Sequence, residues 1–164
     1  MIKTITKLYE NLALRSRILQ TFAKRYYNSM ISNEIRLGAI HKHDRVLFIG
    51  GGPLPMSALM ISERTQAHVE VVDCDFSAIQ KAKWFVAKTP YKISFHHAKA
   101  ETFDIKDYTV IIVAKQVIPQ HCVLDNIFEK VDRGTRIICR FYKPDKKILI
   151  SSSKIAGNAC LIVA

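Results

Sequence analysis

The feature that most constrains this chain is an apolar run that ends in three consecutive glycines, VLFIGGGPLP over residues 46–55. A second apolar run, VEVVD over residues 69–73, ends in Asp73 about 20 residues beyond the glycines. Glycines at the carboxyl end of a strand let the backbone turn sharply and approach a ligand closely, because no Cβ intervenes. An acidic residue that ends the next strand can accept hydrogen bonds from ribose hydroxyls. The pattern predicts a nucleoside-binding βαβ unit.

Two prolines in the glycine loop, Pro53 and Pro55, narrow the choice of nucleoside. A pyrophosphate-binding loop offers backbone N–H groups to the phosphates, and proline has none. Pro55 also stands where dinucleotide folds place the glycine that packs helix against strand. A dinucleotide is therefore disfavoured, whereas S-adenosylmethionine carries adenosine without a phosphate and suits this loop. The open alternative is a glycine turn that binds nothing.

Length and composition indicate a single globular domain. The chain has 164 residues, of which 49% are apolar and 24% charged. No apolar run reaches the roughly 18 residues that a membrane span needs, so we predict a soluble, cytoplasmic protein without a membrane partner. The four cysteines form no CxxC pair and are interpreted as reduced packing residues. The histidines lack the spacing of metal ligands, so the sequence predicts neither a metal site nor a disulfide framework.

The net charge of +11 is concentrated in the two flanks of the chain. Residues 1–45 carry nine Lys or Arg against three acids, whereas residues 46–142 carry twelve against ten. A basic face of this kind could attract an anionic small-molecule acceptor or RNA. The alternative is an ordinary solvated helix surface, because no recognisable RNA-binding motif accompanies the charge.

The order of predicted elements indicates an α/β protein. Apolar residues at three- and four-residue spacings predict one or two amphipathic helices over residues 5–37. Strands and helices then alternate, which predicts a doubly wound, mostly parallel, Rossmann-like sheet. We divide the chain into an amino-terminal helical segment, residues 1–44, and a nucleoside-binding domain, residues 45–164. The predicted strands are 45–49, 68–72, 92–96, 109–114, 136–141, 147–150 and 159–163, and the predicted helices are 55–64, 77–88 and 124–131. A cap for the helix at 77–88 is expected near Asp75 or Ser77.

The chain resembles the class I S-adenosylmethionine-dependent methyltransferase superfamily, and within it nicotianamine synthase and its bacterial opine-metallophore relatives. The resemblance implies a Rossmann-like methyltransferase sheet and S-adenosylmethionine as the cofactor. It is carried by FIGGGPLP at residues 48–55, VVDCDFSAIQKAKWF at 71–85, SFHHAKAETFD at 94–104 and DYTVIIVAKQV at 107–117.

The same resemblance implies roles for individual residues. The glycine loop would lie against the methionine moiety, Asp73 would bind the ribose hydroxyls, and the positions after the second and third strands would border adenine. Lys99 stands where an aspartate is usual. Either Glu101 or a backbone group accepts the hydrogen bond of the adenine amine in its place, or adenine recognition is weakened. The implied cofactor-binding residues are Gly50, Gly51, Gly52, Pro53, Asp73, Cys74, Phe76, Ala98, Ala100, Glu101, Ala114 and Lys115.

Three classes of function follow from the sequence. The first is a methyltransferase that acts on an unidentified acceptor, and the second is transfer of the aminocarboxypropyl arm of the same cofactor. The third is a non-catalytic module that binds the cofactor or RNA. The sequence identifies no general base, and His96 is interpreted as structural. Tyr26 or Tyr27 would contact the acceptor if the amino-terminal helix folds over the pocket. The short helical region suits a large acceptor, a partner protein that completes the site, or a homodimer in which another chain's helices cover it.

Overall fold

The computed structural model describes residues 16–141, 154–156 and 159–164. Its centre is a seven-stranded sheet in the order β3-β2-β1-β4-β5-β7-β6. The first five strands of this order are parallel; β7 pairs antiparallel with β5, and β6 pairs antiparallel with β7. The elements are α2 (Arg17–Leu37), β1 (Arg45–Ile49), α3 (Met56–Thr65), β2 (His68–Asp73), α4 (Phe76–Val86), β3 (Ile93–His97), β4 (Val110–Val113), α5 (Gln120–Lys130), β5 (Arg136–Arg140), β6 (Lys154–Ala156) and β7 (Ala159–Val163).

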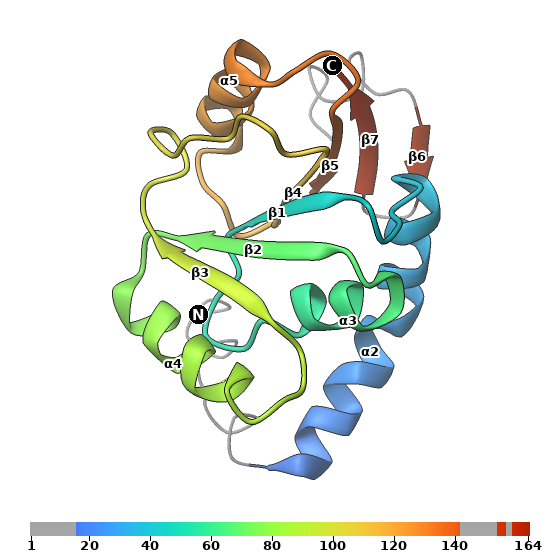
Figure 1. Ribbon diagram of the computed structural model, residues 1–164, viewed down its shortest axis with the longest axis vertical. Helices are drawn as coiled ribbons and strands as arrows, with labels where there is room; N and C mark the ends of the chain where they lie inside the picture. The colour runs from blue at the N-terminus through green and yellow to red at the C-terminus, as the bar shows by residue number, and fades with distance from the viewer. Residues whose placement is uncertain (1–15, 142–153, 157–158) are drawn as a thin grey trace.

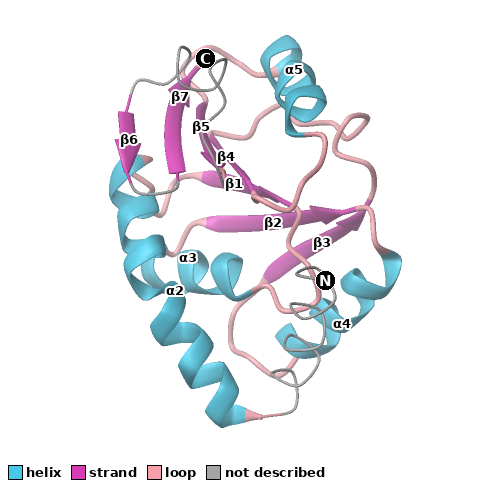
Figure 2. Cartoon of the chain, turned by 180° about the vertical axis from the view of Figure 1, so that it is seen from behind, coloured by secondary structure: helices cyan, strands magenta, loops and turns pink. Residues whose placement is uncertain are grey.

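Helices cover both faces of the sheet (Figures 1 and 2). Side chains of β1 alternate between the faces, as a strand requires. Val46 and Phe48 enter a core with Ile31 of α2 and with α3, whereas Leu47 enters a second core against α5. Because both faces are buried, the central strands are continuously apolar rather than alternating. The doubly wound sheet predicted from the sequence is therefore confirmed.

The chain adds β2 and β3 on one side of β1 and then β4 and β5 on the other side. The strand order therefore reverses between β1 and β4, as in open α/β sheets. In such sheets ligands bind outside the carboxyl ends of the strands at this reversal. The carboxyl ends of β1, β2 and β4 are where the chain places the glycine loop, Asp73 and Ala114. The topology alone thus brings together residues that are more than 60 positions apart.

Most predicted boundaries lie within two residues of the observed ones. The exceptions are α5, which begins at Gln120 rather than at 124, and the predicted helix over residues 5–37, of which the described part is α2. The strand predicted at 147–150 lies outside the described residues. Among the described residues, β7 pairs with β5 on one side and with β6 on the other. The domain boundary at residue 44 stays a prediction. Within the described residues, no helix is both long enough and apolar enough to span a membrane.

Candidate functional site

The loop after β1 can only be built from glycine at its first two positions. Gly50 has a φ of +81°, and a Cβ there would lie 2.6 Å from Cγ2 of Val117. A Cβ on Gly51 would lie 2.3 Å from Cγ1 of Val71, well inside van der Waals contact. The backbone therefore passes closer to the neighbouring strand and loop than any other residue type permits. This is the close approach that a nucleoside-binding turn needs.

Asp73, the last residue of β2, is fixed by the same loop. Its Oδ2 accepts a hydrogen bond from the N–H of Gly52 at 2.9 Å, and its Oδ1 accepts one from the N–H of Asp75 at 2.9 Å. Two carboxylate oxygens offer about four acceptor positions, so two are left for a ligand. The side chain is only half-buried, which leaves those positions accessible. Its geometry fits the role of a ribose-binding acid.

Asp75 continues this arrangement into the next helix. It is the residue before α4, and its Oδ1 accepts the N–H of Ala78 at 3.2 Å. A side-chain acceptor at this position satisfies one of the free N–H groups of the first helical turn. The sequence predicted a cap near Asp75 or Ser77, and the structure assigns it to Asp75. The turn between β2 and α4 is thereby held rigid beside Asp73.

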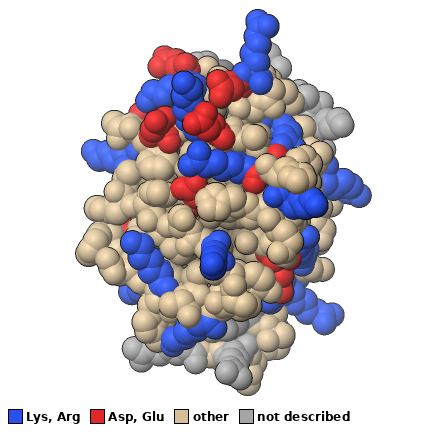
Figure 3. All heavy atoms as spheres, in the orientation of Figure 1, with Lys and Arg blue, Asp and Glu red and all other residues tan. Residues whose placement is uncertain are grey.

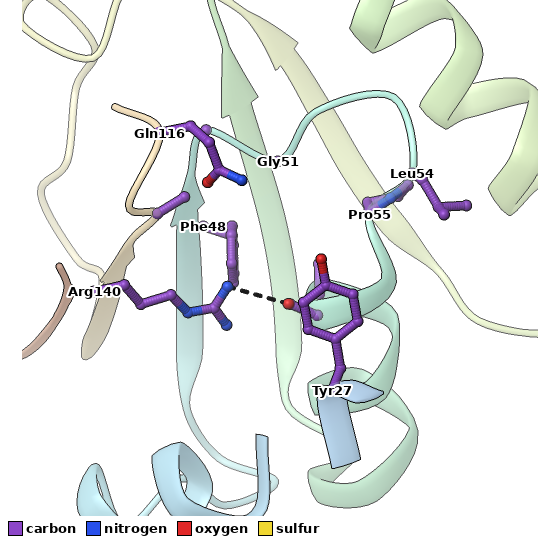
Figure 4. A pocket seen from close by; sticks show the side chains of 11 residues that line it. Tyr27, Phe48, Gly51, Leu54, Pro55, Gln116 and Arg140 are labelled. Atoms are coloured by element: carbon purple, nitrogen blue, oxygen red, sulfur yellow. Dashed lines mark hydrogen bonds between the residues drawn. The ribbon is translucent and has the colours of Figure 1, made fainter. Parts of the chain in front are cut away.

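A hollow of about 380 Å³, part of it open to solvent, lies next to the glycine loop (Figure 4). Gly50 and Gly51 form part of its wall, while Gly52 binds Asp73 just outside it. The nucleoside position and the hollow therefore share one loop. The hollow is lined by Tyr27, Phe48, Gly50, Gly51, Leu54, Pro55, Ser57, Ala58, Ala114, Gln116 and Arg140.

Helix α3 begins at the edge of this hollow. Pro55 precedes the helix, and its carbonyl accepts the N–H of Leu59 at 3.0 Å. The missing N–H of proline costs nothing here, because the first N–H groups of a helix have no partner within it. The proline that argued against a pyrophosphate ligand thus serves as a helix start, and it lines the hollow.

A buried ion pair joins three elements at the hollow. Arg140, at the end of β5, donates from Nε and Nη2 to the two carboxylate oxygens of Glu34 in α2, at 2.6 and 2.7 Å. Its Nη1 donates to Oγ of Ser57 in α3 at 3.2 Å, and Cζ lies 4.9 Å from the ring centre of Phe48. Glu34 and Arg140 are only 1% and 7% exposed. This fork pairs the two charges in the strongest geometry available to them.

The ion pair fixes α2 relative to the sheet, and α2 carries Tyr27 into the hollow. Figure 4 shows the ring of Tyr27 and the guanidinium of Arg140 reaching in from opposite sides. Tyr26, one residue earlier, is 74% exposed and does not line the hollow. From the sequence, either tyrosine was a candidate for contact with the acceptor. The structure places Tyr27 at the site.

Sequence reasoning missed Glu34, Ser57 and Arg140. The one signal for them was Arg140, a charge that directly follows the apolar run IIC of residues 137–139, since a charge in a buried strand must be paired. Its partner lies 106 residues away, so the sequence could not identify it.

The predicted cofactor residues fall into two groups. Gly50, Gly51 and Ala114 line the hollow, whereas Pro53 and Lys115 are not among its lining residues. Around Asp73, the carboxyl ends of β2 and β3 carry the others. Cys74 and Phe76 are exposed there, Ala98 and Ala100 pack partly against the core, and Glu101 is exposed. These residues lie where a base attached to the ribose would extend.

A second polar cluster holds the segment that carries Ala98, Ala100 and Glu101. The carboxylate of Glu70 lies 2.6 Å from Nε2 of His96 and accepts a hydrogen bond from Nε of Arg45 at 3.1 Å. The side chain of Arg45 also lies over the ring of Tyr108, with Cζ 4.5 Å from its centre. Burial, reinforced by the negative charge of Glu70, raises the pKa of Tyr108 to about 12. His96 therefore has a structural partner, consistent with its interpretation from the sequence.

Among residues 16–141, 154–156 and 159–164, no three His, Cys, Asp or Glu side chains are grouped so as to hold a metal ion. Two of the cysteines, Cys139 and Cys160, pack in the core as expected, whereas Cys74 and Cys122 are exposed. The interpretation of the cysteines as packing residues is therefore wrong for Cys74, which follows the last residue of β2, and for Cys122, which lies on an exposed part of α5.

The fold and the glycine–aspartate arrangement define a Rossmann-like protein of the methyltransferase type. A family model described as nicotianamine synthase protein matches residues 20–157. The chain belongs to the nicotianamine synthase family.

Individual proteins are similar to the chain in sequence or in fold. The L-histidine 2-aminobutanoyltransferase of Yersinia pestis is 27% identical over 117 residues, which are 70% of this chain and 44% of that protein. The chain therefore spans less than half the length of this curated relative. A crystal structure of a point mutant of MtNAS in complex with S-adenosylmethionine matches with a TM-score of 0.77 and 22% identity, over 94% of this chain and 69% of the other. An RNA methyltransferase from Salinibacter ruber in complex with S-adenosyl-L-homocysteine matches with a TM-score of 0.66 and 15% identity, over 82% and 90% of the two chains.

Proposed function

We propose that this protein binds S-adenosylmethionine and transfers an alkyl group from it to a small-molecule acceptor. The observation that carries the proposal is the carboxylate of Asp73, fixed by the N–H of Gly52 beside a glycine-walled hollow. A Cβ at Gly51 would collide with Val71, so the glycine lets the loop pack closely on β2, next to Asp73. Membership in the nicotianamine synthase family supports the same cofactor.

Some residues of the site would bind the cofactor, and others would align the acceptor. Asp73 would accept hydrogen bonds from the ribose hydroxyls, and the glycine loop would leave room for the methionine-derived arm. When bound, the cofactor supplies an activated alkyl carbon next to its sulfonium. Tyr27, Gln116 and Ser57 then surround the space in which an acceptor would be aligned with that carbon. Alignment of two reactants in a partly enclosed hollow is the main contribution such a site can make.

Within this class we favour transfer of the aminocarboxypropyl arm. The family supports it, and the Yersinia pestis relative bears the name of an aminobutanoyl transferase. Methyl transfer, which the sequence alone favoured, is the alternative. The two reactions differ in the nucleoside that is left over: methylthioadenosine after transfer of the arm and S-adenosylhomocysteine after transfer of the methyl group.

The test follows from that difference. The purified chain is incubated with labelled S-adenosylmethionine and a pool of free amino acids, and the spent nucleoside is identified by mass spectrometry. Methylthioadenosine with label in an amino acid supports the favoured reaction, and S-adenosylhomocysteine supports methyl transfer. Binding without turnover would leave the non-catalytic class predicted from the sequence. No binding by calorimetry, together with no effect of Asp73→Asn, would refute the proposal as a whole.

The charge distribution favours a small acceptor over RNA. On the face shown in Figure 3, lysine and arginine side chains are separated by neutral surface, and acidic side chains gather near α5. A continuous basic track, as backbone tracking of RNA requires, is not seen on that face. An anionic acceptor, a homodimer and a cytoplasmic location stay predictions.

A further inference from the structure

We infer that His97 determines specificity for adenine by accepting a hydrogen bond from the amino group of the base through Nδ1. The inference rests on the proposed function and deepens it. His97 is not among the residues that the family resemblance implied. It is the last residue of β3, directly beside Asp73 in the register of the two parallel strands.

The position of the base follows from the position of the ribose. The 5′ arm of a nucleoside and its base leave the ribose on different sides. If the arm lies at the glycine loop after β1 and the hydroxyls lie at Asp73 on β2, the base extends toward the end of β3. The N–H of Ala98, the residue after His97, donates to the carbonyl of Asp73 at 3.2 Å, so the two strand ends are held together.

The hydrogen bond of the His97 ring fixes which nitrogen accepts. Nε2 lies 3.2 Å from the backbone carbonyl oxygen of Cys74. A carbonyl oxygen can only accept, so Nε2 carries the proton. In the neutral ring Nδ1 is then an acceptor. The adenine amino group donates at its six-position, whereas the corresponding oxygen of hypoxanthine accepts and would face a lone pair.

A neighbouring aromatic ring completes this part of the site. Phe76 packs edge-on against His97, with ring centres 5.3 Å apart and an angle of 65° between the planes. Phe76 is 58% exposed, so much of its ring is accessible to a ligand. A flat base stacked on this ring would bury it and would bring its edge to the imidazole. The pair thus supplies both a surface and a polar contact.

The nearby backbone offers fewer alternatives. The carbonyl of Lys99 already accepts from the N–H groups of Thr102 and Phe103, at 3.2 and 3.0 Å. The carbonyl of Ala100 accepts from the side-chain amide of Asn126 at 3.0 Å. The side chain of Lys99 can only donate. Glu101, exposed in the same turn, is the rival acceptor and has to be tested beside His97.

The experiment compares two nucleosides by calorimetry, 5′-methylthioadenosine and 5′-methylthioinosine. We expect the unmodified chain to prefer the adenine compound by roughly five- to tenfold, the effect of one neutral hydrogen bond. His97→Phe keeps a ring against Phe76 but removes the acceptor, and it should abolish the preference. His97→Asn retains a donor and an acceptor and should restore part of it. His43→Phe is the matched control, because His43 is an exposed histidine before the amino end of β1, whereas His97 lies at the carboxyl end of β3.

The outcomes separate this inference from the proposed function. If His97→Phe keeps the preference, or if Glu101→Gln abolishes it while His97→Phe does not, the role of His97 is refuted and cofactor binding stands. Equal affinity of the unmodified chain for both nucleosides also refutes it. If the unmodified chain binds neither nucleoside, the proposed function fails and this inference fails with it.

Discussion

The buried pair of Glu34 and Arg140 gives the sharpest stability prediction. Replacing Glu34 by alanine leaves a guanidinium that is 7% exposed without its only carboxylate partner among the described residues. Breaking one side of a buried ion pair typically costs about 3–5 kcal/mol. A domain of this size is stabilised by only about 5–15 kcal/mol, so the loss is a large fraction of the total.

The double variant Glu34→Leu with Arg140→Met tests the reasoning more sharply. Replacing both charges by apolar side chains of similar volume is often neutral or stabilising, because neither charge then has to be desolvated. We expect the double variant to lie within about 1 kcal/mol of the unmodified chain or above it. The single variants Glu34→Leu and Arg140→Met should each lose about 3–5 kcal/mol of unfolding free energy.

Urea unfolding followed by circular dichroism measures these differences. With a slope of about 2 kcal/mol per M, a loss of 3–5 kcal/mol lowers the midpoint by about 1.5–2.5 M. The control is Glu63→Ala, which breaks the 3.1 Å pair with Lys24 between α2 and α3. Those side chains are 36% and 49% exposed, so less than about 1 kcal/mol should be lost. A double variant as unstable as the sum of its singles would refute the argument.

Three further predictions concern the site and its surroundings. Gly51→Ala should lower the unfolding free energy by roughly 1–3 kcal/mol through overlap with Val71; Val71→Ala in the same chain should recover part of it, and thermal melting that shows no loss contradicts the clash. Tyr27→Phe should reduce turnover and leave the affinity for S-adenosylmethionine unchanged by calorimetry, whereas Tyr26→Phe should change neither; equal kinetic effects would contradict the placement of Tyr27. Burial opposes ionisation of Glu70, but hydrogen bonds from a histidine and an arginine outweigh it and hold its pKa below the ordinary value of 4.5. Its contribution to stability is therefore full above pH 4.5 and is lost as the pH falls through the lowered pKa; urea unfolding of Glu70→Gln should show a shallower decline on the acid side, and an unchanged slope would contradict it.

The sheet could be predicted from the sequence because its signals are local. The run VLFI must be buried on both faces, and the glycines that follow it must end the strand. Asp73 could be placed for the same reason, since strand ends in a parallel sheet meet at one edge. The start of α5 could not be placed as well, because Pro119 and Gln120 carry no apolar periodicity that marks a first turn.

The ion pair of Glu34 and Arg140 at the hollow could not be predicted, because the two residues lie 106 positions apart in the sequence. Glu34 lies in a basic, amphipathic helix, and in such a helix the sequence favours a surface position for an acidic side chain. Only the packing of α2 against β5 shows that Glu34 is buried. The choice of Tyr27 over Tyr26 depends on the rotation of α2 about its axis, which neighbouring aromatic positions do not reveal. Nothing in the sequence indicated a role for His97, because the predicted strand ended at His96 and the observed strand β3 extends to His97.

The two backbone N–H groups that bind Asp73 have a consequence for the entropy of association. They hold the carboxylate in one rotamer before any ligand arrives. The ordering of a side chain, about 0.5–1.5 kcal/mol, is thus incurred when the chain folds and does not weaken binding later. A glutamate at position 73 would keep the negative charge but not this advantage, because its longer side chain, with one more rotatable bond, would have to be immobilised each time a nucleoside binds.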